Sequence, residues 1–266
     1  MSDLALPWPA LLAMGLALAS FVGVLAARWP AALADSPAPT AADLLARLCR
    51  PPSHCPHCHT RLRAHELIPV LSWLAQRGRC RHCQAPLGMG DTMLELTGAA
   101  LALLLGWRHG ADGLGLAAGL LFAFTLLALA WLDARSLWLP DALTLPLLWV
   151  GLLYTSLRAP AALPEHVWAA ALGYGLLAGL NAIHLILRRR HGLGGGDAKL
   201  LAALGAWLGL WALPQTLTLA ALAGLIWALF TRQRALAFGP WLAAVGLASW
   251  LWPDKLVALM PFSVTG

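Results

Sequence analysis

The chain has 266 residues, of which 60% are hydrophobic and only 11% are charged. Soluble domains carry about 25% charged residues, so this composition excludes a water-soluble globular protein and a disordered chain. The apolar runs are long and continuous, which excludes the short alternating strands of a transmembrane barrel. The sequence therefore predicts an all-α polytopic membrane protein. The net charge of +6 is attributed to membrane topology, with no nucleic-acid partner.

Charge-poor runs predict about eight membrane-spanning helices. The first is Leu4–Ala27, whose flanking charges, Asp3 before it and Arg28 after it, are the reverse of those of a cleaved signal peptide. Because Leu200–Thr231 is too long for one span, we expect Pro214 to divide it into two helices. The other runs are Thr92–Trp107, Gly113–Leu132, Pro140–Leu157, His166–Leu187 and Ala235–Pro253.

The basic residues indicate the orientation. If the polar segment 28–91 is cytoplasmic, 15 of the 18 Lys and Arg residues fall in inside loops. Lys and Arg accumulate in cytoplasmic loops, so both termini are predicted to lie outside the cytoplasm. The expected organisation is a first helix in 1–27, a cytoplasmic loop in 28–91, two helices in 92–132 and the remaining helices in 133–253.

Two CxxC pairs, Cys55/Cys58 and Cys80/Cys83, lie in the segment 28–91. In a reducing compartment such pairs indicate a metal site, and four thiolates suit one tetrahedral, structural zinc. The alternative is two redox-active or unligated pairs. Cys49 is left over, and four histidines are substitute ligands that a full set of cysteines makes unnecessary: His54, His57, His59 and His82.

Acidic residues within or beside the predicted spans are the second constellation: Glu95, Asp133, Asp141 and Asp197. Ionisable groups in such positions are costly and are candidates for function. Asp133 ends a span that runs inward and Asp197 begins one that runs outward, so both are expected at the cytoplasmic membrane level. Two carboxylates at one depth can share a proton and activate a water. The alternative for a single acid is an interfacial anchor.

Three glycines, Gly194 to Gly196, directly precede Asp197, and Lys199 follows it. A dinucleotide-binding loop would need a preceding strand and a βαβ unit, and neither is present in the sequence pattern. A helix that starts here would place Asp197 at its positive end, and the glycines would let an extended substrate chain approach closely. Lys199 is either a charge partner or an interfacial anchor.

Taken in order, these motifs resemble those of the type IV prepilin peptidases, membrane aspartyl proteases of the GxGD type. The resemblance rests on Ala19–Val22 with Arg28–Pro30, the cysteine loop with Ile68–Leu74, Asp133 followed by Leu139–Thr144, Gly194–Leu200, and Phe238–Pro240. It implies that Asp133 and Asp197 are the catalytic pair and that Cys55, Cys58, Cys80 and Cys83 bind zinc.

The resemblance also implies the activity and the location. Such enzymes lie in the bacterial inner membrane, with the active site and the zinc loop at the cytoplasmic face and, here, periplasmic termini. They cut the leader from type IV prepilins or type II secretion pseudopilins after a glycine, and methylate the new N-terminus from S-adenosylmethionine. Gly23, Leu67 and Gly90–Thr92 depart from the family pattern. These departures lie in the methylation-associated half and predict weaker methylation, whereas the protease half keeps its motifs.

Two other classes of protein fit the same residues. A proton-coupled transporter would use the acids as a proton relay, although no pair of matching broken helices is visible in the sequence. A non-catalytic scaffold of a secretion machine would use the cysteine loop to dock its partners. Cleavage of a leader-bearing pilin-type substrate would separate the peptidase from both.

Overall fold

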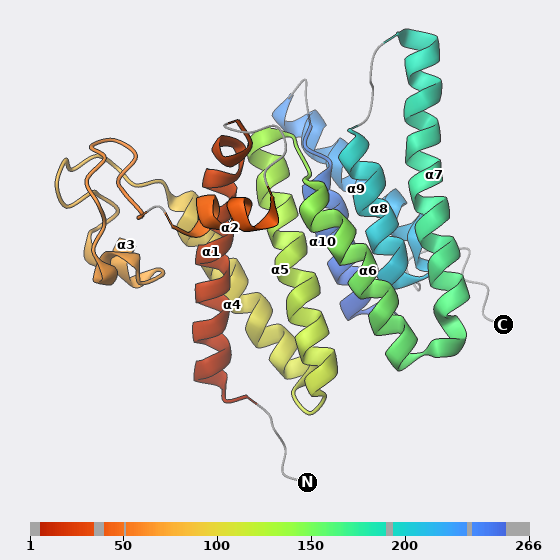
Figure 1. Ribbon diagram of the computed structural model, residues 1–266, viewed down its shortest axis with the longest axis horizontal. Coiled ribbons are helices and arrows are strands. Elements are labelled where there is room, and N and C mark those ends of the chain that lie inside the picture. The colour runs from red at the N-terminus through yellow and green to blue at the C-terminus, as the bar shows by residue number, and fades with distance from the viewer. Residues whose placement is uncertain (1–5, 35–39, 51, 190–193, 233–235, 254–266) are drawn as a thin grey trace. The chain divides into compact units, whose positions relative to one another are not determined.

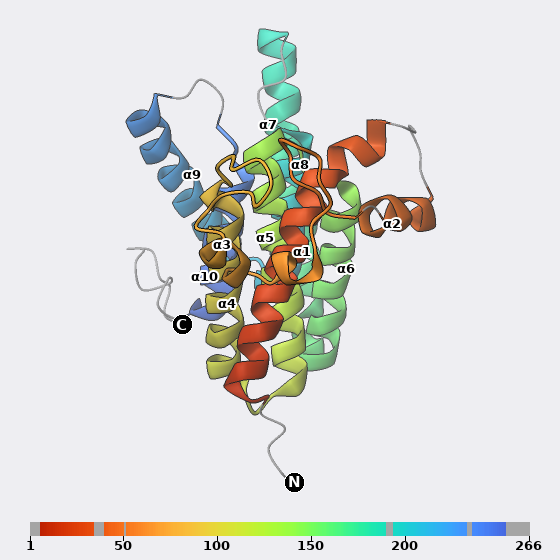
Figure 2. The ribbon, with the colours of Figure 1, turned by 90° about the vertical axis from the view of Figure 1, so that its left-hand side faces the viewer.

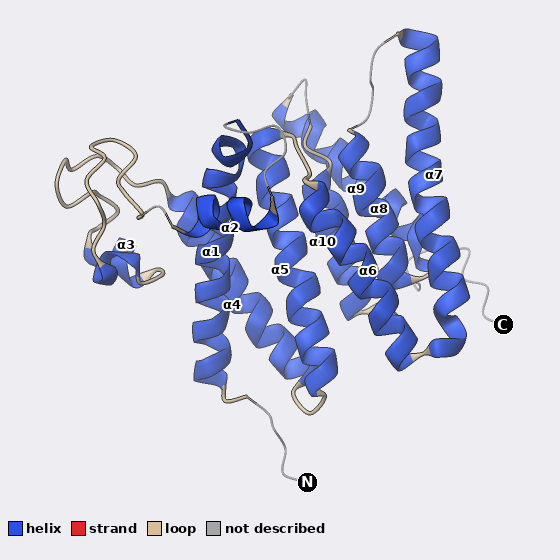
Figure 3. Cartoon of the chain, in the orientation of Figure 1, coloured by secondary structure: helices blue, strands red, loops and turns tan. Residues whose placement is uncertain are grey.

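The fold was analysed in a computed structural model of the chain, which describes residues 6–34, 40–50, 52–189, 194–232 and 236–253. Over these residues the regular structure is helical, and two isolated β-bridges accompany it (Figure 3). The chain divides into two compact units, Met1–Phe124 and Thr125–Gly266, and each unit is treated by itself. The expected all-α class is confirmed.

The first unit is built on two long helices, α1 (Trp8–Ala34) and α4 (Met89–His109), which run side by side (Figure 1, Figure 2). Small residues permit the close approach, since a Cβ on Gly15 would lie 2.6 Å from the carbonyl oxygen of Gly98. Between them the chain forms α2 (Ala41–Cys49), the 3-10 turn η1 (Ala64–Leu67) and α3 (Leu71–Ala75). Helix α5 (Gly113–Ser136) starts in this unit and ends in the next.

Arg28 fixes the first connection of this unit. Its guanidinium donates to the carbonyl oxygen of Leu48 at 2.6 Å and to Ser53 Oγ at 3.3 Å. A cation at the last turn of a helix satisfies free carbonyl groups and favours the helix dipole. The first contact therefore holds the C-terminus of α2 against α1.

The second unit is organised around α8 (Gly195–Leu208), which contacts four other helices of this unit. These neighbours are α6 (Asp141–Arg158), α7 (Leu163–Arg188), α9 (Ala212–Thr231) and α10 (Gly239–Leu251), with the short turn η2 (Pro160–Ala162) between α6 and α7. Every residue of α8 from Leu200 to Trp207 is buried. Trp207 donates its indole N–H to the carbonyl oxygen of Leu147 at 2.9 Å, which ties α8 to α6.

Helix length and exposed apolar surface identify a membrane protein. Among the described residues, five helices are long and apolar enough to cross a membrane: α1, α4, α5, α7 and α9. Large apolar side chains stand exposed on the outside of the bundles, such as Trp149, Leu157, Ile186 and Phe230. Soluble proteins rarely expose so many large apolar side chains, whereas a helix that faces lipid buries them in the hydrocarbon.

The number of crossings stays a prediction. All eight predicted runs contain helices, but α6, α8 and α10 fall outside the five. Helix α8 has 14 residues and is therefore about 21 Å long, short of a hydrocarbon core of about 30 Å. A helix of this length that is buried on all sides fits the interior of a bundle.

The expected break at Pro214 was misplaced. The interruption falls at Gly209, whose φ of +79° ends α8, and Pro214 is the third residue of α9. Proline is tolerated in a first turn because the N–H groups there have no partner within the helix. The glycine, which alone adopts such a backbone readily, was the stronger stop signal.

Candidate active site and metal centre

The four cysteines of the two CxxC pairs meet in the first unit. Their Sγ atoms all lie within 4.8 Å of one another, with 3.9 Å between Cys55 and Cys83 and 3.9 Å between Cys58 and Cys80. A tetrahedral zinc with Zn–S bonds of about 2.3 Å requires sulfur atoms about 3.8 Å apart. A disulfide requires about 2.05 Å, and all five cysteines are free. The arrangement fits one metal with four thiolate ligands.

Each pair lies in a turn with the same hydrogen bonds, a structural repeat that the sequence analysis missed. In the first turn the N–H of Cys55 donates to the Thr60 carbonyl at 3.0 Å, and the N–H of His59 donates to the Cys55 carbonyl at 3.0 Å. The second turn repeats both bonds around Cys80, at 2.9 and 3.0 Å. His59 (φ 55°) and Gln84 (φ 57°) occupy the same left-handed position. Both turns thus preset the direction of their thiols.

Hydrogen bonds favour the thiolate form that a metal requires at two of the four cysteines, whereas burial and hydrogen bonds from the neighbouring thiols raise the pKa of Cys83 to about 11. Side-chain and backbone hydrogen bonding by Thr60 lowers the pKa of Cys58 to about 6. The backbone N–H groups of Cys83 and His82 lower the pKa of the Cys80 thiol. Partners of this kind orient the ligands of metal sites and tune their basicity.

The candidate substitute ligands lie outside this cluster. Four histidines surround the cysteines and are all exposed: His54, His57, His59 and His82. Cys49, the fifth cysteine, is also exposed and does not belong to the group of four. The ligand set predicted from spacing is the one that the fold assembles.

Asp133 and Asp197 come together in the second unit, from α5 and α8. Both side chains are buried, with 5% and 8% of their surface exposed. They lie near enough to interact electrostatically. Two buried carboxylates repel when both are ionised, which favours a proton on one of them. Pairs of this kind can exchange protons with a bound water.

Asp197 lies at the third position of α8, where its carboxylate turns back toward the helix start. The backbone of Gly194, the residue before the first turn, hydrogen-bonds the carboxylate. This is half of a capping box, with an acid at the third helical position bonded to the capping N–H. The other oxygen, Oδ1, is buried and has no hydrogen-bond partner among the described residues. A buried oxygen without a partner is free to bind a water or substrate group.

Asp133 is held by the start of a different helix. The N–H of Gly239, the first residue of α10, donates to Asp133 Oδ2 at 2.8 Å. Glycine is needed there, because a Cβ would lie 2.8 Å from that oxygen and 3.1 Å from the carboxyl carbon. Gly239 and Asp133 are 106 residues apart, so no local sequence pattern links them, and only the family resemblance points to Phe238–Pro240.

The two remaining acids have partners of their own. Glu95 Oε2 accepts the N–H of Val70 at 2.8 Å and so fixes the loop that carries α3. Asp141 forms an ion pair with Lys199 at 2.5 Å, which decides the role of that lysine in favour of a charge partner. Each contact gives its acid a structural role.

The glycines before Asp197 have different surroundings. A Cβ on Gly196 would lie 2.6 Å from the Cβ of Leu139, so this glycine permits packing within the chain. A Cβ on Gly194 would lie 3.0 Å from Asp197 Oδ2. Around Gly195 there is open space. Of the three glycines, Gly195 is therefore the one that leaves room for the expected close approach of a substrate chain.

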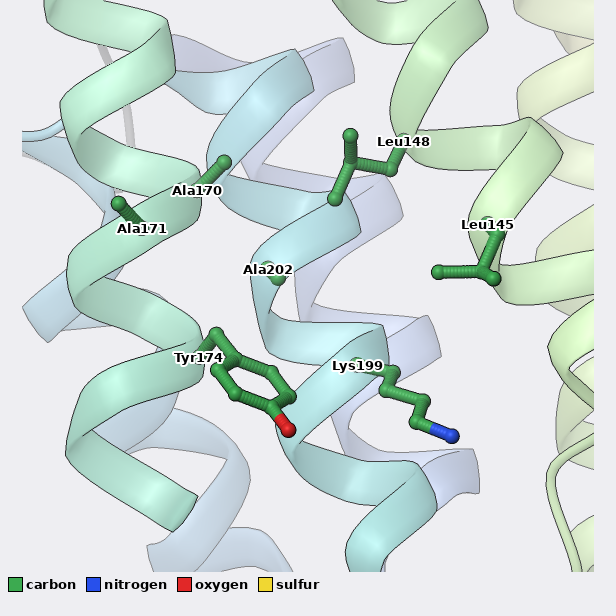
Figure 4. Close-up of a pocket in the computed structure, with 7 residues that line it drawn as sticks. All are labelled: Leu145, Leu148, Ala170, Ala171, Tyr174, Lys199 and Ala202. Carbon is green, nitrogen blue, oxygen red and sulfur yellow. The ribbon is translucent and has the colours of Figure 1, made fainter. Parts of the chain in front are cut away.

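An apolar groove of about 380 Å³ lies between α6, α7 and α8, beside Lys199 (Figure 4). Aliphatic side chains line most of it: Leu145, Leu148, Ala170, Ala171 and Ala202. Tyr174 extends from α7 over α8 and, with Lys199, supplies the polar groups. Lys199 is two residues after Asp197, so the groove lies on the same helix, α8, that carries one of the two acids.

The fold and the site together define a helical membrane protein with a buried pair of aspartates and a cluster of four cysteines that could hold a metal ion. Comparison with known proteins agrees with that class. Residues 13–109 match the Bacterial Peptidase A24 N-terminal domain, and residues 120–229 match the Type IV leader peptidase family. No solved structure matches the chain.

Curated relatives cover most of both chains. The chain is 44% identical over 255 residues to a prepilin leader peptidase/N-methyltransferase of Burkholderia pseudomallei, covering 89% of this chain and 82% of the relative. Proteins of the same name from Dickeya chrysanthemi and Stutzerimonas stutzeri are 43% and 35% identical, covering 89% and 93% of this chain and 89% and 91% of the relatives. The chain therefore belongs to the type IV leader peptidase family.

Proposed function

We propose that the chain is a membrane aspartyl endopeptidase that removes the leader peptide of type IV prepilins or type II secretion pseudopilins after a glycine. The observation that carries this proposal is the buried pair Asp133 and Asp197, which come from helices far apart in the sequence, α5 and α8, and lie close together in the fold. The names of the relatives support the substrate class.

The two acids have different surroundings, which suggests different roles. Each carboxylate accepts one backbone N–H, but Asp197 also has a buried oxygen with no hydrogen-bond partner among the described residues. Burial without a partner disfavours the charged form, so Asp133 is assigned as the ionised member. Asp133 then takes a proton from water as the water oxygen attacks the scissile carbonyl carbon. Protonated Asp197 donates to the carbonyl oxygen and stabilises the developing charge. Collapse of the tetrahedral intermediate returns the carbonyl proton to Asp197, while Asp133 passes its proton to the leaving amine.

The four cysteines are proposed to hold a structural zinc. Four thiolates leave no coordination position open for water or substrate, so the metal contributes to folding of the loop and not to hydrolysis. The preset turns around Cys55 and Cys80 support this assignment.

We further propose that the new N-terminus is methylated from S-adenosylmethionine. The match over residues 13–109 and the names of the relatives support this second activity. The three departures in this half, at Gly23, Leu67 and Gly90–Thr92, still lead us to expect incomplete methylation. The residues that bind S-adenosylmethionine are not assigned.

The proposed location is the bacterial inner membrane, with the bilayer as a permanent partner, both termini periplasmic, and the acids and cysteines facing the cytoplasm. The distribution of Lys and Arg supports this orientation.

The test uses purified full-length chain in detergent with a leader-bearing pilin-type substrate. Release of the leader after a glycine is expected from the natural chain, and none from a variant that carries both Asp133→Asn and Asp197→Asn. Equal cleavage by both proteins would assign the activity to a contaminant and overturn the proposal, as would no cleavage by a zinc-loaded, folded chain.

A further inference from the structure

Four large apolar side chains stand exposed on the cysteine loop, on η1, α3 and the residue that follows η1. They are Leu67, Ile68, Leu71 and Leu74, with 46%, 45%, 62% and 57% of their surface exposed. We call this set the leucine face. Leu71 and Leu74, three residues apart, lie on one side of α3, and Leu67 and Ile68 lie just before that helix in the chain. Exposed apolar surface of this density marks a contact with another molecule or with a membrane.

The loop also carries a dense positive charge. Five arginines between residues 52 and 88 are exposed: Arg61, Arg63, Arg77, Arg79 and Arg81. The one acid in this stretch is Glu66, which accepts the N–H of Arg63 at 2.8 Å. This bond lowers the pKa of Glu66 and keeps it ionised, but one carboxylate leaves most of the positive charge unmatched. Arginines beside apolar side chains are typical of elements that lie in an anionic membrane interface.

The loop is hydrogen-bonded to α4, one of the helices long and apolar enough to cross a membrane, near the start of that helix. The N–H of Val70, directly before α3, donates to Glu95 at 2.8 Å, in the second turn of α4. Glu95 lies about 9 Å along the helix axis from Met89, at 1.5 Å per residue. Val70 has a φ of +59°, a strained value for a β-branched residue. The bond to Glu95 therefore holds the start of α3 in one orientation, beside the membrane end of α4.

From these three observations we infer that the leucine face inserts into the interface of the anionic cytoplasmic leaflet, with the arginines at the phosphate groups. The partner is the lipid surface itself, recognised by apolar burial and by charge. The inference does not depend on the proposed cleavage, but it rests on the proposed orientation, which places the loop on the cytoplasmic side. It gives Glu95 the role of a positioning residue that holds the metal loop on the membrane.

The experiment uses the full-length, zinc-loaded chain in nanodiscs of phosphatidylcholine, with or without phosphatidylglycerol. A photo-crosslinking amino acid replaces Leu71 or Leu74, and replaces His57 in the control, an exposed polar site at the tip of the first cysteine turn. Intact-mass analysis then identifies what each probe has bound. Phospholipid adducts are expected at Leu71 and Leu74 and not at His57, with a higher yield when phosphatidylglycerol is present.

A charge arm and a folding arm complete the test. Arg61→Gln or Arg77→Gln should each lower the phosphatidylglycerol-dependent excess of adducts by up to about fivefold. Metal analysis must show that each variant keeps its zinc, which separates lost lipid contact from an unfolded loop. Adducts to the chain itself, or to an added pilin-type substrate, would overturn the inference. Equal lipid yields at Leu71 and His57 would overturn it too.

Discussion

The metal centre and the acid pair are built in opposite ways. The four cysteines come from one loop, and hydrogen bonds between near neighbours set the direction of each pair. The two aspartates come from separate helices, and a third helix, α10, holds one of them through Gly239. The metal centre therefore depends on local turns and a metal, whereas the acid pair depends on the packing of a whole helical unit. A single substitution should affect the two sites very differently.

The largest expected effect comes from the acids. Asp133→Asn or Asp197→Asn keeps the shape of the side chain but removes a group that exchanges protons, so leader removal should fall by a factor of 10³ or more, on the order of a full acid–base contribution. Cleavage is measured on membranes with matched expression of each variant. Glu95→Gln serves as a matched acid-to-amide control, because its amide oxygen still accepts the Val70 N–H. Substantial cleavage by either asparagine variant would refute the pair.

Gly239→Ala tests the support of Asp133. The added Cβ would lie 2.8 Å from Asp133 Oδ2, so the carboxylate must move, and a misplacement of about 1 Å can cost roughly 10²-fold in rate. We expect a lower kcat with little change in KM. Gly246→Ala is the control on the same helix, since its Cβ would meet the end of the Leu204 side chain at 2.5 Å. It should lower stability by about 1–3 kcal/mol and leave kcat of the folded protein unchanged.

The two variants distinguish positioning from packing. If Gly239→Ala and Gly246→Ala lose activity in proportion to their loss of folded protein, the bond to Asp133 has no special role. If only Gly239→Ala loses kcat at full stability, the start of α10 belongs to the catalytic apparatus.

The same contrast explains what the sequence could predict. Cys55, Cys58, Cys80 and Cys83 followed from spacing alone, because their geometry is local. Asp133 and Asp197 followed from span parity and motif resemblance, but their support by Gly194 and Gly239 did not, because a backbone N–H has no sequence signal. Glu95 was selected as an acid near a span, and only the fold shows that it holds Val70. The roles of positions that depend on contacts between distant segments could therefore not be predicted from the sequence.

Cys58→Ser tests the metal centre. The natural chain should hold about one zinc, and the variant should lose it, because three thiolates and a hydroxyl bind zinc far more weakly. Cleavage should fall several-fold through a smaller folded fraction, with kcat of the remaining folded protein unchanged. Cys49→Ser is the control, since Cys49 is exposed and outside the cluster. Zinc retained in Cys58→Ser, or a Cys58–Cys80 disulfide in fresh membranes, would contradict the site.

Gly23→Asn tests the methylation half without touching the acids. The resemblance of the first motif implies asparagine at this position, and the ideal Cβ position lies an ordinary 3.5 Å from Leu94 and 3.7 Å from Asp91. We expect the natural chain to give a partly methylated product and the variant to raise the methylated fraction, with cleavage unchanged. Mass spectrometry of the mature substrate measures both. A fully methylated product from the natural chain would show that the departures are tolerated.

The smallest effect on cleavage is expected from breaking the ion pair of Asp141 and Lys199, although Lys199 is only two residues from Asp197. Both side chains are part-exposed, at 55% and 32%, and exposed pairs contribute at most about 1 kcal/mol. Asp141→Asn and Lys199→Met should therefore change kcat by less than about fivefold. Lys199 also lines the apolar groove, so Lys199→Met should alter KM more than Asp141→Asn does if the substrate enters there. Leader removal measured over a range of substrate concentrations separates the two constants. A collapse of kcat in Asp141→Asn would show that the reaction uses a third acid in addition to the buried pair.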